Sequence, residues 1–370
     1  MAMERDQSLC DRIRTAVEMC GRAHDRTSEP DLNALRRFRV LPGRLHGRAV
    51  KRAVVALRTR GCRWLRTPGG TCTYCGLGSD GLWDPHLRHC AIAARDETLH
   101  DIGSQDVPLV CLYTAGSFLD DQEISAEERL EALSMIRKVP GLEAVLIESR
   151  PEFVMADRIR EIKDALGGVD LIVGVGLDAV TDDVRTLCAN KQFDLSTYAR
   201  SVDAVKQVGA GLLTYVVLKP PFLLEGESVQ EATRTAEYAF AHGSDTVSLE
   251  PVSVQAGTLT ELLWKHGLYR PPWLWSVAKV ATTVAHLGEV AVGGAVVYPA
   301  SERDPHNCPL CSDRMRSALQ AFSVSQDKSV VAQVACSCKE EWDMAVRETG
   351  QDLRTRIQIA LDQVGARLGE

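Results

Sequence analysis

Residues 53–77 read AVVALRTRGCRWLRTPGGTCTYCGL and carry three cysteines, Cys62, Cys72 and Cys75. The apolar run at 53–57 predicts a buried strand, so the cysteines follow on a loop where that strand ends. Nine residues separate the first two cysteines and two residues separate the second pair. Three thiols so placed are typical of a metal site, and the kind of metal decides the chemistry.

Three kinds of site fit this spacing. Three thiolates can bind three irons of a [4Fe–4S] cluster and leave the fourth iron open, which radical chemistry with S-adenosylmethionine (SAM) requires. A zinc site is an equal alternative, and His86, His89 or Cys90 could supply its fourth ligand. Cys72 and Cys75 could also form a cytosolic redox pair. The spacing alone leaves all three open.

Composition indicates a cytoplasmic globular protein without a membrane partner. The 370 residues, 45% hydrophobic and 25% charged, suffice for one large domain with extensions. No apolar stretch approaches the roughly 20 residues that span a bilayer, and the N-terminus lacks the apolar core of a signal peptide. We therefore expect the twelve cysteines to be thiols and metal ligands rather than disulfides.

The net charge of −7 argues against a surface built mainly to hold nucleic acid. One segment is an exception, because it carries eleven basic residues and no acidic one. Such a run could contact phosphates or offset acidic surface elsewhere. Its members are Arg36, Arg37, Arg39, Arg44, Arg48, Lys51, Arg52, Arg58, Arg60, Arg63 and Arg66.

Apolar runs alternate with helical patterns over residues 51–285. We expect strands at 54–59, 107–113, 144–148, 171–175, 212–218 and 246–250, and helices at 125–138, 152–166, 179–188, 196–208 and 228–242. This alternation predicts parallel strands with helical crossovers, an α/β fold in which six units form a partial (β/α)₆ TIM-like barrel. Residues 1–50 are expected to form a helical extension ending in a turn at 41–43, and 286–370 a C-terminal module.

Polar and turn residues follow each of the six strands. Any one of them is ordinarily a capping residue, but the chemistry of such barrels lies where the strands end. Six polar strand ends that begin with a three-cysteine loop therefore predict a site at that edge. After the cysteines, the residues concerned are Gly116, Ser117, Glu148, Arg150, Asp178, Lys219, Glu250 and Gln255.

At this point the chain resembles a known family, the radical SAM enzymes of the archaeosine synthase type, which are distantly related to the Elongator catalytic subunit. The resemblance covers roughly residues 50–345 and implies a radical SAM barrel. It also implies that Cys62, Cys72 and Cys75 hold a [4Fe–4S] cluster at which SAM is cleaved to a 5′-deoxyadenosyl radical. The segments that carry it include RGCRW, GGTCTYCGL, YTAGSFLD, IESRPEF, NKQF, YVVLKPPF, QAGTLTELLW, YRPPWLWS, HNCPLC, FSVSQD and CSCKEEW.

The resemblance implies a set of residues that bind the cofactor. Tyr74 would lie near the adenine, and Gly116 and Ser117 would offer backbone groups to the methionyl amine. The family usually has Glu where this chain has Asp178, so the contact of that shorter carboxylate is in doubt. The implied cofactor-binding set is Tyr74, Gly116, Ser117, Glu148, Arg150, Asp178, Asn190 and Lys191.

The family also suggests a substrate and partners. The archaeal enzyme acts on tRNA that carries a lysine-substituted 7-deazaguanine, and it leaves a formamidine. We expect radical fragmentation or rearrangement of this base, with an external electron donor and a tRNA transglycosylase as partners. A small-molecule precursor of a natural product is a second hypothesis. A non-catalytic, zinc-containing nucleic-acid-binding protein is a third.

Five residues are candidates for contact with the substrate. Lys219 ends an apolar strand, so its amine could bind an anion, although a salt bridge to a neighbouring carboxylate is an equal alternative. Glu250 and Gln255 follow the last strand, and Lys219, Glu250 and Tyr269 are the catalytic candidates. Trp273 lies in a Pro-rich loop and could either fill the core or stack on a flat ring.

Four more cysteines form a second group near the C-terminus. Cys308 and Cys311 form a CxxC, and Cys336 and Cys338 form a CxC. Four thiolates on two short turns fit a closed tetrahedral zinc site, and they would equally hold an auxiliary [4Fe–4S] cluster. Both metals remain open at this stage.

Overall fold

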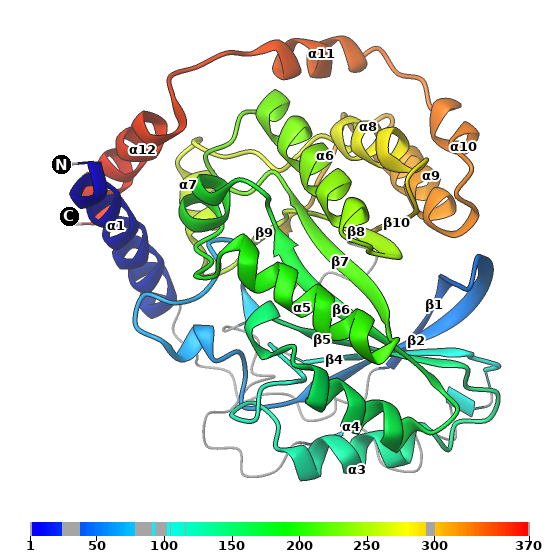
Figure 1. Ribbon diagram of the computed structural model, residues 1–370. Coiled ribbons are helices and arrows are strands. Elements are labelled where there is room, and N and C mark those ends of the chain that lie inside the picture. Colours follow the sequence, from blue (N-terminus) through cyan, green and yellow to red (C-terminus); the bar gives the residue numbers. More distant parts are fainter. Residues whose placement is uncertain are drawn as a thin grey trace.

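A computed structural model of the chain describes residues 2–23, 38–77, 91–92, 102–103, 105–114, 116–293 and 300–368. Its centre is a curled β-sheet with helices on its outer side (Figure 1). The main strands lie in the order β1-β2-β4-β5-β6-β7-β8-β10. Among the helices of the described residues, none is long and apolar enough to cross a membrane.

Six neighbouring strands of this sheet are parallel, which confirms the predicted α/β half-barrel. Each lies close to a strand expected from the sequence. They are β2 (Arg48–Arg58), β4 (Leu109–Tyr113), β5 (Ala144–Ser149), β6 (Asp170–Asp178), β7 (Gly211–Leu218) and β8 (Thr246–Pro251).

The crossover helices also match the expected positions, with one difference. The helix expected at 179–188 is only a π-helical turn, Val184–Cys188, before α5 begins. Side chains cap several of these helices; Ser125 and Glu128, for example, form a capping box at the start of α3. The crossover helices are α3 (Ala126–Ile136), α4 (Ala156–Leu166), α5 (Leu195–Val208) and α6 (Glu225–Ala241).

Two further strands extend the sheet beyond the six. β10 (Glu289–Val292) pairs in parallel with β8, and β1 (Phe38–Leu45) pairs antiparallel with β2. The turn expected at 41–43 is therefore wrong, because these residues lie inside β1. An edge strand tolerates Pro42, whose missing N–H breaks no ladder on its open side. The chain turns instead at His46 and Gly47, both with positive φ.

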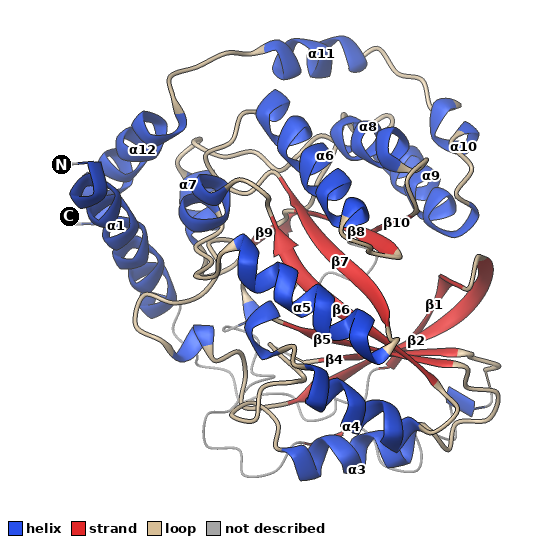
Figure 2. Cartoon of the chain, viewed as in Figure 1, coloured by secondary structure: helices blue, strands red, loops and turns tan. Residues whose placement is uncertain are grey.

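The remaining elements flank the barrel (Figure 2). The predicted N-terminal helix is present as α1, which packs beside α12, so the two ends of the chain lie together. Leu9 and Ile13 of α1 share an apolar cluster with Ile357 and Leu361 of α12. These elements are α1 (Ala2–Ala23), β3 (Ala91–Ile92), β9 (Val254–Gln255), α7 (Leu259–Lys265), α8 (Leu274–Val284), β11 (Ser301–Arg303), α9 (Ser312–Ser325), α10 (Ser329–Ala332), α11 (Lys339–Arg347) and α12 (Leu353–Leu368).

The two faces of the sheet differ in burial. On β2, Ala53, Val55 and Leu57 are buried in the large core beneath the helices. The alternate residues Val54 and Ala56 point to the concave side and are only half-buried by the described residues. The concave face is therefore the side of the sheet that is available to line a site.

Candidate functional site

The three N-terminal cysteines lie on the loop after β2, as the sequence predicts. Burial raises the pKa of Cys62 to about 12, although the nearby charge of Arg150 opposes this shift. Burial also raises the pKa of Cys75 well above its usual value, and Cys72 adds to that effect. Thiols of this kind become thiolates when a metal supplies positive charge, so the donor set suits a metal group.

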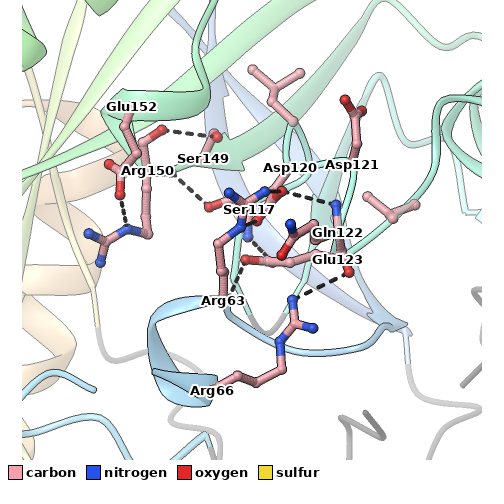
Figure 3. Close-up of polar contacts among 12 residues, drawn as sticks. Arg63, Arg66, Ser117, Asp120, Asp121, Gln122, Glu123, Ser149, Arg150 and Glu152 are labelled. Atoms are coloured by element: carbon pink, nitrogen blue, oxygen red, sulfur yellow. Dashed lines mark hydrogen bonds and ion pairs between the residues drawn. The ribbon is translucent and has the colours of Figure 1, made fainter. Parts of the chain in front are cut away.

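Glu123, which the sequence analysis missed, joins the cysteine loop to the loop after β4 (Figure 3). Its carboxylate accepts hydrogen bonds from the backbone N–H of Arg63, at 2.8 Å, and of Ser117. Only 1% of Glu123 is exposed, and burial raises its pKa to about 8. Gly116 packs into the same junction, because an added Cβ would lie 2.6 Å from the Cα of Cys62.

Arg63 and Ser117 extend this junction to the loop after β5. The Nε of Arg63 donates to Asp120 Oδ2 at 2.8 Å, and its guanidinium lies 4.6 Å from the ring centre of Phe153. The hydroxyl of Ser117 accepts from the backbone N–H of Arg150 at 3.1 Å. The predicted cofactor residue Ser117 thus already uses its N–H and its hydroxyl within the protein.

Asn190 supports the cysteine loop from the opposite side. Its amide donates to the carbonyl oxygens of Gly69, at 3.1 Å, and Thr71, at 2.7 Å, both of which lie between Cys62 and Cys72. The backbone carbonyl of Asn190 accepts a hydrogen bond from Trp64 Nε1 at 2.9 Å. Asn190 has a φ of 55°, a conformation that Asn tolerates better than most residues. These contacts show that Asn190 supports the loop, and its contact with a cofactor stays a prediction.

Tyr74, Asp178 and Lys191 form a buried group beside the second cysteine pair. Lys191 Nζ lies 2.7 Å from Asp178 Oδ2. Burial raises the pKa of Tyr74 well above its usual value, and the charge of Asp178 adds to this. The hydroxyl of Thr71 is buried without a hydrogen-bond partner among the described residues, and the buried hydroxyl of Tyr74 lies beside the carboxylate of Asp178. An unsatisfied buried polar atom next to three thiols fits a polar ligand such as SAM.

Two predicted residues, Glu148 and Glu250, bring carboxyl groups to the concave face. Glu148 accepts from the backbone N–H of Thr114 at 3.1 Å, and Glu250 accepts from the hydroxyl of Ser248 at 2.6 Å. Burial raises the pKa of Glu148 to about 8 and that of Glu250 to about 7. Near neutral pH both groups therefore carry protons for part of the time and can donate hydrogen bonds.

The other predicted substrate residues make contacts within the protein. Lys219 Nζ lies 2.6 Å from Glu225 Oε2, and Glu225 also accepts from the backbone N–H of Trp273 at 2.9 Å. The hydroxyl of Tyr269 donates to the carbonyl of Lys219 at 2.9 Å. Gln255 accepts from the backbone N–H that follows Cys75, at 2.6 Å. Contact of these four residues with a substrate stays a prediction.

Several residues of the basic run at 36–66 form ion pairs with acidic residues of the same chain. Arg44 lies 3.0 Å from Glu289, and Arg48 and Arg63 pair with Glu143 and Asp120. These pairs favour the interpretation that the run offsets acidic groups. Arg36 and Arg37, together with the alternative zinc ligands His86, His89 and Cys90, lie outside the described residues.

The C-terminal cysteines converge on one point. The sulfur of Cys308 lies 3.8 Å from that of Cys311 and 3.5 Å from that of Cys336, and Cys311 and Cys338 are 3.5 Å apart. All four sulfurs lie within 4.8 Å of one another. Trp275 Nε1 donates to Cys338 Sγ at 3.4 Å. The geometry and donor set of this group fit a metal ion.

No protein-family model matches the chain. It is 31% identical over 300 residues to archaeosine synthase subunit beta of Methanosarcina acetivorans, which covers 80% of this chain and 86% of the relative. It is 30% identical over 295 residues to the protein of the same name from Thermococcus kodakarensis. This alignment covers 79% of this chain and 90% of the relative.

Among solved structures, methylornithine synthase superposes with a TM-score of 0.48 and 12% identity, over 85% of this chain and 81% of that one. An archaeal Elp3 from Methanocaldococcus infernus gives a TM-score of 0.45 and 14% identity, over 62% and 58%. These similarities are too low to bear on function.

The role of Asn190 can be tested by two substitutions. Asn190→Gly keeps the positive φ but removes both hydrogen bonds, which costs about 1–3 kcal/mol, and Asn190→Ala adds the strain of φ 55°, about 1–2 kcal/mol more. We expect both variants to unfold at lower denaturant concentration and to retain less iron after anaerobic reconstitution, with the alanine variant worse. Glu237→Ala, at an exposed position of α6, is the control. Full iron content with weakened SAM binding alone would show instead that Asn190 contacts the cofactor.

Proposed function

The chain belongs to the archaeosine synthase subunit beta family and is a radical SAM enzyme, and we propose that it fragments a lysine-substituted 7-deazaguanine in tRNA. The observation that carries this proposal is the loop of Cys62, Cys72 and Cys75 at the mouth of a half-barrel, in a chain 31% identical to archaeosine synthase subunit beta over 80% of its length.

The residues at the strand ends suit the cofactors that this family implies. Cys62, Cys72 and Cys75 would hold a [4Fe–4S] cluster with one open iron. When bound, the cluster and SAM would supply a 5′-deoxyadenosyl radical. Tyr74 lies within electrostatic range of Cys72 and Cys75, and Arg150 within range of Cys62 and Cys72, so both would lie beside the cluster.

Protein side chains would then bind and orient the substrate on the concave face. Glu148 and Glu250 are half-buried carboxyl groups whose pKa values of about 8 and about 7 allow them to donate hydrogen bonds near neutral pH. Such donors suit the carbonyl and ring nitrogen acceptors of a deazaguanine.

A partner subunit belongs to this proposal. The relatives are named as subunit beta, which implies at least one other subunit in their enzyme. Because the basic run of this chain pairs with acidic residues, such as Arg44 with Glu289 and Arg48 with Glu143, much of the affinity for tRNA phosphates would come from the partner. A transglycosylase-like subunit fits that role. An external donor would supply the electron.

Because the basic residues are dispersed in pairs with acidic residues, an alternative substrate is a small molecule that needs no phosphate-binding surface.

The tRNA and small-molecule proposals are distinguished by anaerobic incubation of the reconstituted protein and its partner subunit with dithionite, SAM and tRNA carrying the lysine-substituted base. Mass spectrometry of the digested tRNA should show loss of the lysine skeleton and formation of a formamidine, and Cys72→Ala should leave the base intact. Unchanged tRNA alongside active SAM cleavage would contradict the tRNA proposal.

Zinc is the ion that best suits the C-terminal cysteines. Four sulfurs at about 2.3 Å from one tetrahedral Zn²⁺ lie about 3.8 Å apart, close to the 3.5–3.8 Å separations of the sulfurs here. The thiolates of a [4Fe–4S] cluster bind four different irons and lie farther apart. The N–H of Trp275 would stabilise the thiolate of Cys338, as outer hydrogen bonds do at zinc sites.

Metal analysis tests this assignment. A variant with Cys62, Cys72 and Cys75 all replaced by Ala should keep one zinc per chain and contain no iron. Adding Cys338→Ala should release the zinc and lower the unfolding temperature, whereas adding Cys10→Ala, on α1, should change neither. Iron and acid-labile sulfide retained by the triple variant would show a second cluster instead.

A further inference from the structure

Arg52 is a basic residue on the concave face of the barrel. Its neighbours on β2, Ala53 and Val55, point to the helices and are buried, so Arg52 points the other way. It lies opposite Leu109 of β4, in the middle of the strand rather than at the strand end that carries the cysteines. Arg52 thus belongs to the basic run of the sequence and faces the concave side, where we place the substrate.

The fold leaves room for this side chain. Gly43 lies on the neighbouring edge strand β1, and an added Cβ there would be 3.0 Å from Cδ and 3.1 Å from Cγ of Arg52. Any larger residue at 43 would crowd the aliphatic part of the arginine. The guanidinium reaches the interior, where it is within electrostatic range of Cys111 first and then of Tyr113, Tyr215 and Glu250.

Arg52 forms no ion pair with a carboxylate among the described residues, although its guanidinium lies against the thiol of Cys111. Its Nε is buried, and no described group accepts a hydrogen bond from it. The hydroxyl of Tyr215, in the same interior, is also buried and lies beside that of Tyr113. Glu250 is within electrostatic range of Arg52. A cation with an unsatisfied buried donor is costly unless a ligand completes the site.

We propose that Arg52 binds the carboxylate of the lysine substituent on the base. This inference rests on the proposed function and names the part of the substrate that the interior recognises. A guanidinium matches a carboxylate through two parallel hydrogen bonds, and the Tyr215 hydroxyl can donate a third. Because Arg52 faces the concave side away from the strand end, it suits a group at the end of a long side chain better than the phosphates of a folded tRNA. Arg52 therefore selects the lysine form of the base.

The proposal is tested with two substrates that differ only in the carboxylate. One is tRNA with the lysine-substituted base, and the other carries 1,5-diaminopentane in place of lysine. Charged hydrogen bonds of this kind are worth about 10- to 100-fold in kcat/KM, so the native holoenzyme should prefer the lysine form by that factor. In Arg52→Met, kcat/KM for the lysine form should fall by this factor, mainly because KM rises. The kcat/KM for the diaminopentane form should not change.

Two controls keep the result specific. Arg48→Met, on the same strand and paired with Glu143 at the surface, should behave as the native enzyme on both substrates. SAM cleavage without substrate should be equal in the native protein and Arg52→Met, which shows that the variant is folded and loaded. Equal use of both substrates by the native enzyme, or an equal loss on both in Arg52→Met, would overturn the proposal.

A binding measurement separates this inference from the tRNA proposal. Titration calorimetry of the holoenzyme with L-lysine, 1,5-diaminopentane and inorganic phosphate should show tightest binding of L-lysine, and Arg52→Met should remove the preference over diaminopentane. If the tRNA is not turned over but this preference holds, the tRNA proposal fails and the assignment of Arg52 stands. Tighter binding of phosphate, or no effect of Arg52→Met on L-lysine, overturns the assignment.

Discussion

The carboxylate of Glu123 is the contact on which the position of the cysteine loop depends. It accepts hydrogen bonds from the backbone N–H of Arg63, next to Cys62, and of Ser117, on the loop after β4. Two main-chain donors on different loops are thereby fixed to one buried group. Because backbone N–H groups cannot be left unsatisfied in the interior, the two loops move together or not at all.

The rest of the cysteine loop is held from the other side of the barrel. Asn190, after β6, donates to two carbonyls of the loop, and Thr260, on α7, donates to the carbonyl of Thr73 through both its N–H and its hydroxyl. The loop has little regular structure of its own, so its shape comes from these distant polar groups. The positions of Cys62, Cys72 and Cys75 therefore depend on these contacts, as residues that support a site from outside do.

The signals that the sequence carries locally were sufficient for most of the fold. Six apolar runs predicted the six parallel strands, and the CxxC and CxC pairs predicted a C-terminal cysteine group that the structure brings together. β1 escaped prediction because Pro42 and Gly43 are typical of turns, whereas at a sheet edge they cost little. β10 has only four residues, too few for a periodic pattern.

Site residues were harder to predict, because their roles depend on partners far away in the sequence. Glu123 is an acid in a polar turn, and nothing in its neighbourhood distinguishes it from a capping residue. Asn190 donates to carbonyls of the cysteine loop and Lys219 pairs with Glu225, and neither partner lies within the sequence pattern that marked these residues as candidates. Sequence patterns indicate that a polar residue stands at a strand end, and tertiary packing decides what it touches.

The central claim is that Cys62, Cys72 and Cys75 hold a cluster at which SAM is cleaved. The most direct measurement is the yield of 5′-deoxyadenosine from SAM after anaerobic reconstitution with iron and sulfide and reduction with dithionite. The account predicts 5′-deoxyadenosine from the native protein and none above background from Cys72→Ala. Equal yields from the two proteins, or no product from native protein with a full complement of iron, would contradict it.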